Sequence, residues 1–385
     1  MSNVLFLPMP GHGHVNPTLA VAAELVERGH RVGYLLPEPF RAAVEATGAE
    51  FVALDVELDD TPPPSAGAVP PFALLMGRLF AVAEAAAEPL LALHDELRPG
   101  LVVGEGMSLW GGLLAKARAA NLAHLSPSYV ITAMRERMQA AMPAGTPPID
   151  TARLGAIAQR YGVAPRDAAG IMFRPAPLTV AFMPAEFHPD RESLPGSVHF
   201  VGPALGRADS AGDVPLPDGP LLYISLGTVF NDRKAFFDDC IAAFGGVEHP
   251  VVINHGARLS AADFPQAPPN ITLAPHVPQL AVLARSAAFI THGGMGSTME
   301  AIASGVPLVV VPQMIEQEIT ASRAAELGLG VRLDPADVTP ERLAEAVRTV
   351  TTDPSYRTAV EQLGKAARAA GGAAAAADLL VAAAR

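Results

Sequence analysis

The sequence predicts an α/β protein with two halves of the same class, each built on a parallel sheet. The chain has 385 residues, which is too long for one ordinary hydrophobic core and sufficient for two. Short apolar runs alternate with helical patterns at the start of the chain, and the alternation begins again after residue 220. Strands that are separated by helices indicate a parallel sheet that is covered on both faces.

Composition disfavours several classes of function. Hydrophobic residues make up 50% of the chain and charged residues 17%, which favours a folded protein over a disordered one. The formal net charge of −12 disfavours nucleic acid and anionic membranes as partners. The single cysteine, Cys240, allows no disulfide within the chain and fits a reduced, cytoplasmic setting. We expect no signal peptide and no stable membrane insertion, because no apolar run approaches the ~20 residues that a membrane span needs.

In the first half, three short apolar runs are predicted strands: residues 4–7, 32–36 and 51–54. A glycine-rich loop begins at Gly11, Pro17 suits the first position of the following helix, and Gly29 ends that helix. From residue 61 to residue 171 the alternation loosens into proline clusters and alanine-rich helices. Three methionines there are spaced four residues apart, which fits either core packing or an adaptable apolar pocket: Met134, Met138 and Met142.

A segment rich in Asp, Gly, Pro and Ser, residues 206–219, divides the chain and is typical of an interdomain linker. We therefore expect an N-terminal domain over residues 1–205 and a C-terminal domain over residues 220–365. Four apolar runs are predicted strands of the second domain: residues 221–225, 250–254, 288–291 and 307–311. Residues 366–385 are almost all alanine and are predicted to form a helical tail without a function of its own.

The most informative segment is one strand–loop–helix–strand unit in the second half. The strand ends at Thr291, a loop with three glycines follows, and Ser297 or Thr298 is expected to cap a helix that ends before Gly305. Such a loop lies at the carboxyl edge of a parallel sheet, where open α/β sheets bind ligands. The N–H groups of the helix N-terminus suit a phosphate, and glycines let it approach the backbone. The alternative is a glycine turn that only joins strand to helix.

At these residues the sequence resembles a known family. The segment His292-Gly-Gly-Met-Gly-Ser-Thr-Met-Glu300 is similar to the donor-binding signature of nucleotide-sugar-dependent glycosyltransferases with two facing Rossmann-like domains, the GT-B fold. Four further motifs of the family are matched in order: Gly11-His-Gly-His-Val-Asn-Pro17, Ser225-Leu-Gly-Thr228, His276-Val-Pro-Gln279 and Pro312-Gln-Met-Ile-Glu-Gln317. The resemblance is strongest from residue 221 to residue 330, and it points to the bacterial macrolide glycosyltransferases, in the same family as the plant and animal UDP-glycosyltransferases.

The resemblance implies an α/β fold of two facing Rossmann-like domains with a cleft between them, and it also assigns site residues. Those implied for the donor nucleotide and its phosphates are Gly13, Thr228, His276, Val277, Gln279, His292, Gly294, Met295, Gly296, Ser297 and Glu300. Those implied for the donor sugar are Glu316 and Gln317. Two positions depart from the family's pattern: His276 stands where many members carry Trp, and Glu105 stands where many carry Asp.

The resemblance further implies a catalytic pair. His14 would be the general base that activates the acceptor hydroxyl, a task that histidine performs near neutral pH. Glu105 follows an apolar strand over residues 101–103, so it should reach the same sheet edge and fix the tautomer of His14. His292, Ser297, Thr228 and the helix N-terminus would stabilise the diphosphate leaving group. Family members invert the anomeric centre in one displacement, so an α-linked donor would give a β-glycoside.

No metal and no other cofactor is expected. The chain has no Asp-x-Asp pair, which is the usual carboxylate pair of metal-dependent sugar transfer. His12 and His14 form a His-x-His pair, but no third ligand lies near it in the sequence, so zinc is disfavoured.

UDP-glucose is the expected donor, because Glu316 and Gln317 together suit a fully hydroxylated hexose. The expected acceptor is a macrolide, another polyketide or a phenolic natural product. A dTDP-deoxysugar donor, a nucleotide-sugar epimerase or hydrolase, and a non-catalytic sugar-nucleotide binder are alternatives. A nicotinamide dehydrogenase is disfavoured, because the first loop lacks the third glycine of that fingerprint. The sequence leaves the oligomeric state open between a monomer and a homodimer.

Overall fold

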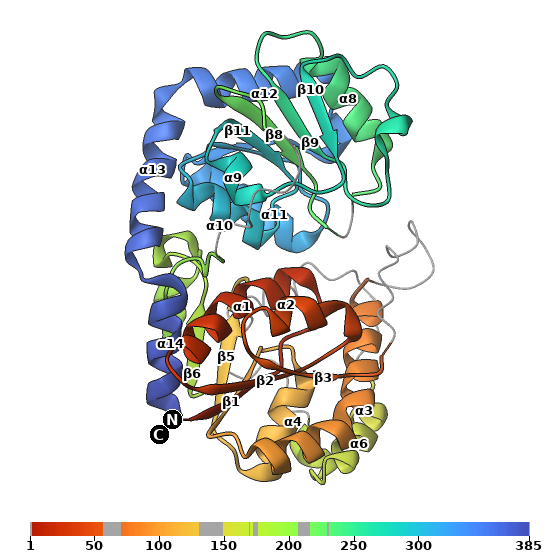
Figure 1. The fold of residues 1–385 in the computed structure, drawn as a ribbon, viewed down its shortest axis with the longest axis vertical. Helices are drawn as coiled ribbons and strands as arrows, with labels where there is room; N and C mark the ends of the chain where they lie inside the picture. Colours follow the sequence, from red (N-terminus) through yellow and green to blue (C-terminus); the bar gives the residue numbers. More distant parts are fainter. Residues whose placement is uncertain are drawn as a thin grey trace. The chain divides into compact units, whose positions relative to one another are not determined.

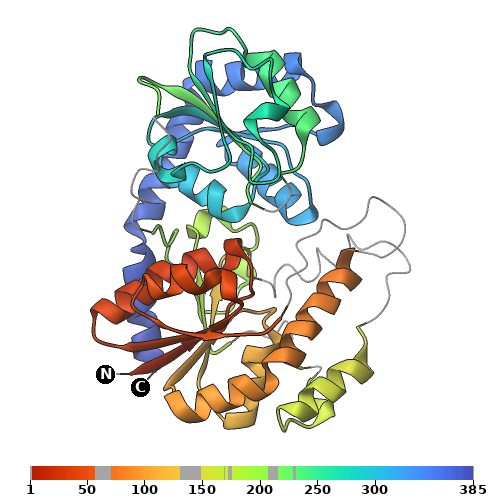
Figure 2. The ribbon, with the colours of Figure 1, turned by 45° about the vertical axis from the view of Figure 1, so that its right-hand side comes forward.

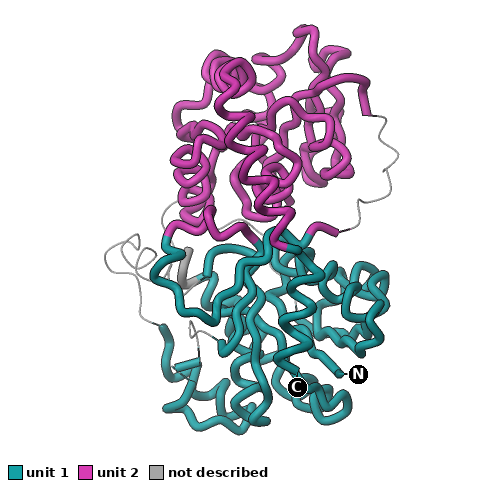
Figure 3. Tube along the Cα trace, turned by 90° about the vertical axis from the view of Figure 1, so that its left-hand side faces the viewer, with its two compact units in different colours: residues 1–182, 190–204, 371–385 teal, residues 183–189, 205–370 magenta. Residues whose placement is uncertain are grey.

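The computed structural model divides the chain into two units, which Figure 3 shows in different colours. It describes residues 2–56, 71–130, 149–168, 170–171, 176–206, 216–228 and 231–384. The first unit consists of Met1–Phe182, Asp190–Ala204 and Gly371–Arg385, and the second consists of Met183–Pro189 and Leu205–Ala370. Residues 207–215 of the predicted linker and the three methionines Met134, Met138 and Met142 lie outside the described residues.

The first unit is built on a seven-stranded parallel sheet with the order β3-β2-β1-β4-β5-β6-β7 (Figure 1). Its strands are β1 (Asn3–Phe6), β2 (Arg31–Leu36), β3 (Glu50–Ala53), β4 (Leu101–Gly104), β5 (Leu122–Ser126), β6 (Leu178–Ala181) and β7 (Val198–Phe200). Its helices are α1 (His12–Glu27), α2 (Arg41–Glu45), α3 (Pro71–Leu97), α4 (Leu109–Arg118), α6 (Thr151–Arg160), α7 (Pro165–Ala168) and α14 (Gly372–Ala383). The strand order reverses between β1 and β4, so the carboxyl ends of these two strands form the switch point where such sheets bind ligands.

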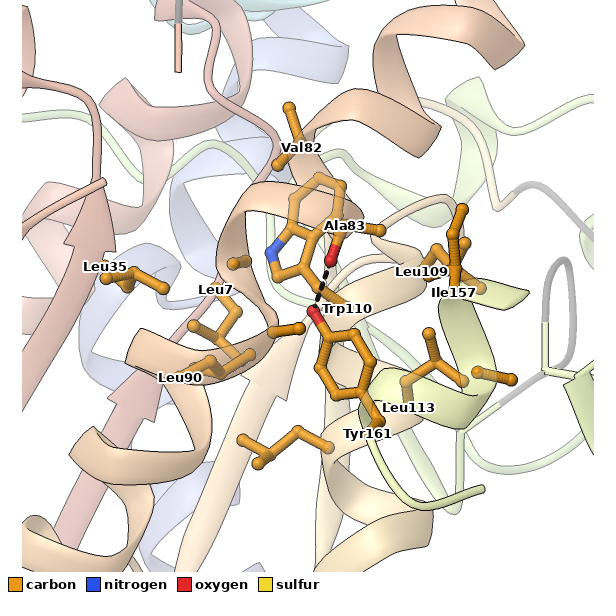
Figure 4. Close-up of a cluster of buried hydrophobic side chains, with 14 of the residues drawn as sticks. Leu7, Leu35, Val82, Ala83, Leu90, Leu109, Trp110, Leu113, Ile157 and Tyr161 are labelled. Atoms are coloured by element: carbon orange, nitrogen blue, oxygen red, sulfur yellow. Dashed lines mark hydrogen bonds between the residues drawn. The ribbon is translucent and has the colours of Figure 1, made fainter. Parts of the chain in front are cut away.

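Alternate strand residues of the first unit face two hydrophobic clusters, one on each side of the sheet. Phe6 belongs to the cluster under α1 and α14, whereas Leu7, the next residue, belongs to the cluster under α3, α4 and α6. In the latter cluster, Trp110 is buried and the hydroxyl of Tyr161 donates to the carbonyl of Ala83 at 2.8 Å (Figure 4). Burial on both faces is typical of a parallel sheet, and it explains why these strands are continuous apolar runs in the sequence.

One local prediction for this unit was wrong. Helix α1 begins at His12 rather than at Pro17, because Gly11 is the extended N-cap and its carbonyl already accepts from the N–H of Val15. The described part of the stretch from residue 61 to residue 171 forms helices, as its alanine-rich composition predicted. It contains the 27-residue helix α3, which lies beside α6 (Figure 2), and Arg153 of α6 forms a bidentate ion pair with Glu84 of α3 at 2.8 and 2.7 Å.

The C-terminal alanine-rich segment differs from the tail that the sequence predicted. The expected boundary at residue 366 falls inside α13 (Pro354–Ala369), and a break at Gly371, whose φ is +96°, separates α13 from α14. Helix α14 belongs to the first unit and packs on α1, where Leu380 is fully buried (Figure 1). Arg28 of α1 and Asp378 of α14 form an ion pair at 2.5 Å. The tail therefore completes the core of the N-terminal unit.

By length and composition alone, one segment within the described part of the chain could cross a membrane, which the sequence analysis did not expect. This segment is Pro354–Ala383, which contains an 18-residue window with a mean hydropathy of 1.3. Its apolar character comes largely from alanine, and the break at Gly371 interrupts it.

The second unit is built on a six-stranded parallel sheet with the order β10-β9-β8-β11-β12-β13. Its strands are β8 (Leu221–Ser225), β9 (Val251–Asn254), β10 (Ile271–Ala274), β11 (Ser286–Thr291), β12 (Leu308–Val310) and β13 (Gly330–Arg332). Its helices are α8 (Lys234–Phe244), α9 (Gln279–Leu283), α10 (Met295–Ala303), α11 (Ile315–Glu326), α12 (Pro340–Thr352) and α13. The order reverses between β8 and β11, so this unit has its own switch point, and the predicted α/β class with two parallel sheets is confirmed.

Candidate active site

The first candidate site lies at the switch point of the first unit. His14 is in the first turn of α1, after the loop that follows β1, and Glu105 directly follows β4. The Nδ1 atom of His14 lies 2.7 Å from Oε2 of Glu105. The His14 side chain is 29% exposed and the Glu105 side chain only 6% exposed, so this pair offers its imidazole to ligands while its carboxylate is buried.

The carboxylate of Glu105 is fixed by the backbone around it. Its Oε1 accepts from the N–H of Met9 at 2.9 Å, in the loop after β1. The N–H of Glu105 donates to Oγ of Ser108 at 2.9 Å. Gly104 permits this turn, because a Cβ atom at that position would lie 2.7 Å from Oγ of Ser108. Met9 therefore holds the carboxylate of Glu105, and Ser108 holds its backbone.

This geometry selects one tautomer of His14. A carboxylate can only accept, so the contact places the proton of a neutral imidazole on Nδ1 and leaves Nε2 as an acceptor. An imidazole held in this way can take a proton from a hydroxyl group, and the carboxylate stabilises the imidazolium that results. Glu105 makes this contact although its side chain is one methylene longer than the Asp in the family's pattern.

The second candidate site lies at the switch point of the second unit, where the loops after β8 and β11 meet. The imidazole of His292, after β11, is packed between two glycines. A Cβ atom would lie 2.6 Å from its Cε1 at Gly227 and 2.5 Å from its Nε2 at Gly294. Burial lowers the pKa of His292 to about 4, so its imidazole is neutral at physiological pH. It can therefore donate one hydrogen bond to a phosphate but adds no positive charge.

Helix α10 begins earlier than the sequence predicted. Its N-cap is Gly294 in an extended conformation, and no side chain caps it, so the prediction that Ser297 or Thr298 is the cap was wrong. The first helical bond at this end runs from the N–H of Thr298 to the carbonyl of Gly294 at 3.0 Å. The N–H groups of Met295, Gly296 and Ser297 therefore precede the helical ladder, which is the arrangement that suits an anion.

Unpartnered polar atoms gather at this sheet edge. Within the described residues, four buried side-chain atoms have no hydrogen-bond partner: Oδ1 of Asn231, Nδ1 of His292, Oγ1 of Thr298 and Nε2 of Gln313. All four belong to the second unit and lie on α10 or on the loops that follow β8, β11 and β12. Because such atoms are costly inside a fold, their concentration marks a region built for a polar ligand rather than for stability.

A side-chain network joins α9 to the first turns of α10. The Nε2 atom of Gln279 donates to Oγ of Ser297 at 3.1 Å and to Oε2 of Glu300 at 2.5 Å. Val277 is buried and anchors the loop before α9, whereas His276 beside it is exposed. The fold thus brings together the motif over residues 276–279 and the motif over residues 292–300.

The two residues predicted for the donor sugar are placed differently from each other. Glu316 is exposed in the first turn of α11, whereas Gln317 is only 6% exposed. The Oε1 atom of Gln317 accepts from the N–H of Gln313 at 2.8 Å, which closes the turn after β12. Consecutive residues of a helix point about 100° apart. The sequence predicted a side-by-side pair, and the helix separates its members.

Three further predicted site residues are exposed: Gly13, Thr228 and Gly296. A Cβ atom on Gly13 or Gly296 would meet nothing within 4 Å, so protein packing does not require glycine there. Tyr223 is not among the residues predicted from the sequence, although its hydroxyl donates to Oε1 of Gln279 at 2.9 Å. No pattern could have revealed it, because a tyrosine within an apolar strand is indistinguishable from core.

The structure gives one observation that bears on metal binding. In the part of the chain that it describes, no group of three or more His, Cys, Asp or Glu side chains is arranged to hold an ion. The ring of His12 lies 5.1 Å from the ring of Phe40, whereas the ring of His14 contacts Glu105.

Comparisons with known proteins agree with this architecture. Residues 238–382 match a family model described as the C-terminal domain of erythromycin biosynthesis protein CIII-like proteins. The chain is 36% identical to the NDP-glycosyltransferase YjiC of Bacillus licheniformis, over 98% of this chain and 96% of that protein. It is 33% identical to demethyllactenocin mycarosyltransferase of Streptomyces fradiae, over 99% of this chain and 86% of that one. The crystal structure of the glycosyltransferase of kitacinnamycin superposes with a TM-score of 0.86 at 31% identity, covering 99% of this chain and 98% of that one.

The likenesses to the two relatives and to the crystal structure extend over nearly the whole chain, and they define the class as the glycosyltransferases of the GT-B fold. The chain belongs to the family of bacterial NDP-glycosyltransferases and macrolide glycosyltransferases. It is therefore an enzyme that transfers a sugar, as the sequence motifs predicted.

Proposed function

We propose that this enzyme transfers glucose from UDP-glucose to a hydroxyl group of a small apolar acceptor, such as a macrolide, another polyketide or a phenolic natural product. The observation that carries the proposal is the 2.7 Å contact between Nδ1 of His14 and Oε2 of Glu105. A sugar transfer to a hydroxyl group needs a base of fixed tautomer, and a binder that only senses sugar nucleotides does not.

The chemical step uses His14 as general base. Its Nε2 accepts the hydroxyl proton while the acceptor oxygen forms a bond to the anomeric carbon of the donor. The bond from that carbon to the diphosphate oxygen breaks on the opposite face, so an α-linked donor gives a β-glycoside and free nucleoside diphosphate. Glu105 stays ionised and stabilises the imidazolium.

The second unit supplies the groups that hold the leaving diphosphate. The N–H groups at the start of α10 and the hydroxyls of Ser297 and Thr228 donate to it, and neutral His292 adds one donor. These groups are fixed before the reaction, so they stabilise the developing charge without reorganisation. We propose that they serve in place of a metal ion, and that the enzyme needs no cofactor.

Recognition of the rest of the donor falls to the neighbouring residues. His276 and Val277 would lie against the nucleobase, and Glu300 would accept from the ribose hydroxyls. Glu316 and the amide nitrogen of Gln317 would bind hydroxyls of the hexose. Two relatives support glucose by their names: zeaxanthin glucosyltransferase of Pantoea ananas and the uncharacterized UDP-glucosyltransferase YdhE of Bacillus subtilis.

A dTDP-deoxysugar donor is the second candidate, favoured by one observation. Because Oε1 of Gln317 already accepts from the N–H of Gln313, this side chain offers fewer groups to a hexose than the sequence indicated. The named activity of the mycarosyltransferase relative points in the same direction. The two candidates are separated by kcat/KM for UDP-glucose and for a dTDP-deoxyhexose on one acceptor.

We place the enzyme in the cytoplasm, acting on small molecules and not on nucleic acid. Its one cysteine, Cys240, is buried, and burial raises the pKa of the thiol well above its usual value, so it is unreactive there.

The proposal is tested by release of nucleoside diphosphate, measured with and without an apolar hydroxylated acceptor. Transfer predicts fast release only with the acceptor, and a glycoside of matching mass. Equal release without the acceptor would indicate a hydrolase, and no release would indicate a binder. Activity should also survive exhaustive chelation, and a loss that magnesium or manganese restores would contradict the metal-free mechanism.

A further inference from the structure

A buried tyrosine lies beneath the proposed donor site, in the second unit. Tyr223 is in the middle of β8 and is fully buried, with its ring stacked on that of Phe289 at 4.6 Å. Its hydroxyl donates to Oε1 of Gln279, the first residue of α9, at 2.9 Å. A core residue of the sheet therefore contacts the side chain that begins the network with α10.

The contacts of Gln279 allow only one orientation of its amide. Its Nε2 donates to Oε2 of Glu300 at 2.5 Å, and a carboxylate can only accept. A reversed amide would set two oxygens against each other at Glu300, whereas the hydroxyl of Tyr223 can either donate or accept. The carboxylate thus selects the orientation, and the tyrosine hydroxyl holds the other end of the amide in place.

The hydroxyl of Tyr223 keeps its proton under all ordinary conditions. Burial raises the pKa of Tyr223 to about 12, and the charge of Glu300 adds to that rise, although hydrogen bonding to Asn254 and Ser225 opposes it. A protonated hydroxyl in this position remains a donor to Gln279. Ionisation of Tyr223 therefore does not break its hydrogen bond to Gln279 at ordinary pH.

We propose that Tyr223 is a positioning residue for recognition of the donor's ribose. By fixing the amide of Gln279, it holds the carboxylate of Glu300 in one place on α10. This inference rests on the proposed function, in which Glu300 accepts from the ribose hydroxyls. A held carboxylate favours a ribose, which offers two neighbouring hydroxyls, over a 2′-deoxyribose, which offers one. Tyr223 thereby contributes to the choice between UDP-linked and dTDP-linked donors without touching either.

The chain offers a matched control for the test. Tyr34 of β2 is also fully buried, stacks on Phe6 at 5.0 Å, and donates its hydroxyl to Oγ1 of Thr18 at 3.0 Å. It belongs to the first unit, whereas the Gln279 network belongs to the second. Tyr34→Phe removes the same atom from the same kind of environment, so it reports what the loss of a buried hydroxyl does to folding alone.

The experiment is calorimetric titration of the full chain with UDP and with 2′-deoxyuridine diphosphate, which share a base. The wild type should prefer UDP. Tyr223→Phe should weaken UDP binding by about tenfold and deoxyuridine diphosphate binding by much less, since one fixed hydrogen bond to a charged group is lost. Tyr34→Phe should leave both affinities and their ratio unchanged. The inference is overturned if folded Tyr223→Phe has the same ratio of UDP affinity to deoxyuridine diphosphate affinity as the wild type. It is also overturned if the wild type does not prefer UDP.

A second variant makes the result independent of how well Tyr223→Phe folds. Gln279→Met removes the amide and should lose the preference for UDP to the same extent. The double variant should lose no more than either single one, because both changes break the same chain of hydrogen bonds from Tyr223 to Glu300. Tyr223 does not act through Gln279 if Gln279→Met keeps the wild-type ratio of the two affinities. The same conclusion follows if the losses of UDP preference in the two single variants add up in the double variant. Failure of the wild type to bind either diphosphate would instead contradict the proposed function.

Discussion

A Cβ atom on Gly364 would lie 2.2 Å from the carbonyl oxygen of Ile302, so α13 and α10 meet backbone to backbone. Arg368, one turn further along α13, donates to the carbonyl of Ala303 at the end of α10. A cation at a helix C-terminus is stabilising, so both contacts secure the end of α10 that faces away from the proposed phosphate site.

Gly364→Ala should destabilise the protein by about 1–3 kcal/mol, because the added methyl group forces the two backbones apart. It should also weaken UDP binding, since α10 must move. Gly77 of α3 is the control, because a Cβ atom there meets nothing within 4 Å. Gly77→Ala should stabilise by roughly 0.5–1 kcal/mol. Urea unfolding measures both free energies, and equal effects of the two substitutions would contradict the packing argument.

His14→Ala should lower kcat by about 10²–10⁴-fold while leaving UDP affinity nearly unchanged, because the general base acts only on the acceptor. Steady-state kinetics and calorimetric titration measure the two quantities separately. Full activity in this variant would remove His14 from the mechanism, and parallel loss of UDP binding would indicate a structural role instead.

Glu105→Gln should lower kcat at least about tenfold, but less than His14→Ala does, because it removes the charge that stabilises the imidazolium and not the base. The side chain keeps its shape, so the melting temperature should change little. Glu50→Gln is the matched control, since Glu50 on β3 is exposed and pairs with Arg31. Parent-like turnover in Glu105→Gln would show that the 2.7 Å contact with His14 has no catalytic consequence.

Ala119→Gly should stabilise the first unit by up to about 1 kcal/mol, because Ala119 ends α4 in the left-handed conformation with a φ of +51°. Ala117→Gly, two residues earlier inside the same helix, should destabilise by about 1 kcal/mol. In urea unfolding, the two substitutions should change the free energy of unfolding in opposite directions. A loss of stability at Ala119 would mean that the unfolded chain's entropy outweighs the relieved strain.

Stability should fall as the pH falls from about 6.5 to about 4. Burial lowers the pKa of His124 on β5 to about 4, whereas an unfolded histidine titrates at 6.5. Between these values the unfolded chain binds the proton and the folded chain does not, which costs the folded state on the order of 3 kcal/mol by pH 4. Burial lowers the pKa of His292 to about 4 as well, so His124→Gln should remove about half of the slope of the stability–pH curve in this range. Urea unfolding measures the slope, and an unchanged slope would contradict the assignment.

Sequence patterns predicted this fold well where a pattern reports a local property. Residues 221–225 were expected as a strand and form β8, because an apolar run between turns reports burial on both faces. The motifs over residues 11–17 and 292–300 also located both switch-point loops, because a motif is a local pattern too. Patterns failed where the structure depends on distant partners. The core role of α14 follows from packing on α1, and the side chain of Gln279 is held by a hydrogen bond from Tyr223, 56 residues away.

The docking of α14 on α1 has a consequence for biosynthesis. The first unit is completed by a helix that is synthesised after the second unit, so the surface around Val21 and Leu25 stays uncovered until residues 372–383 have been translated. A nascent chain stalled after residue 205 would present that apolar surface to chaperones, and an N-terminal fragment expressed alone would have the same defect. Supplying α14 as a separate peptide, or moving it by circular permutation ahead of Met1, would let this half mature without waiting for its partner.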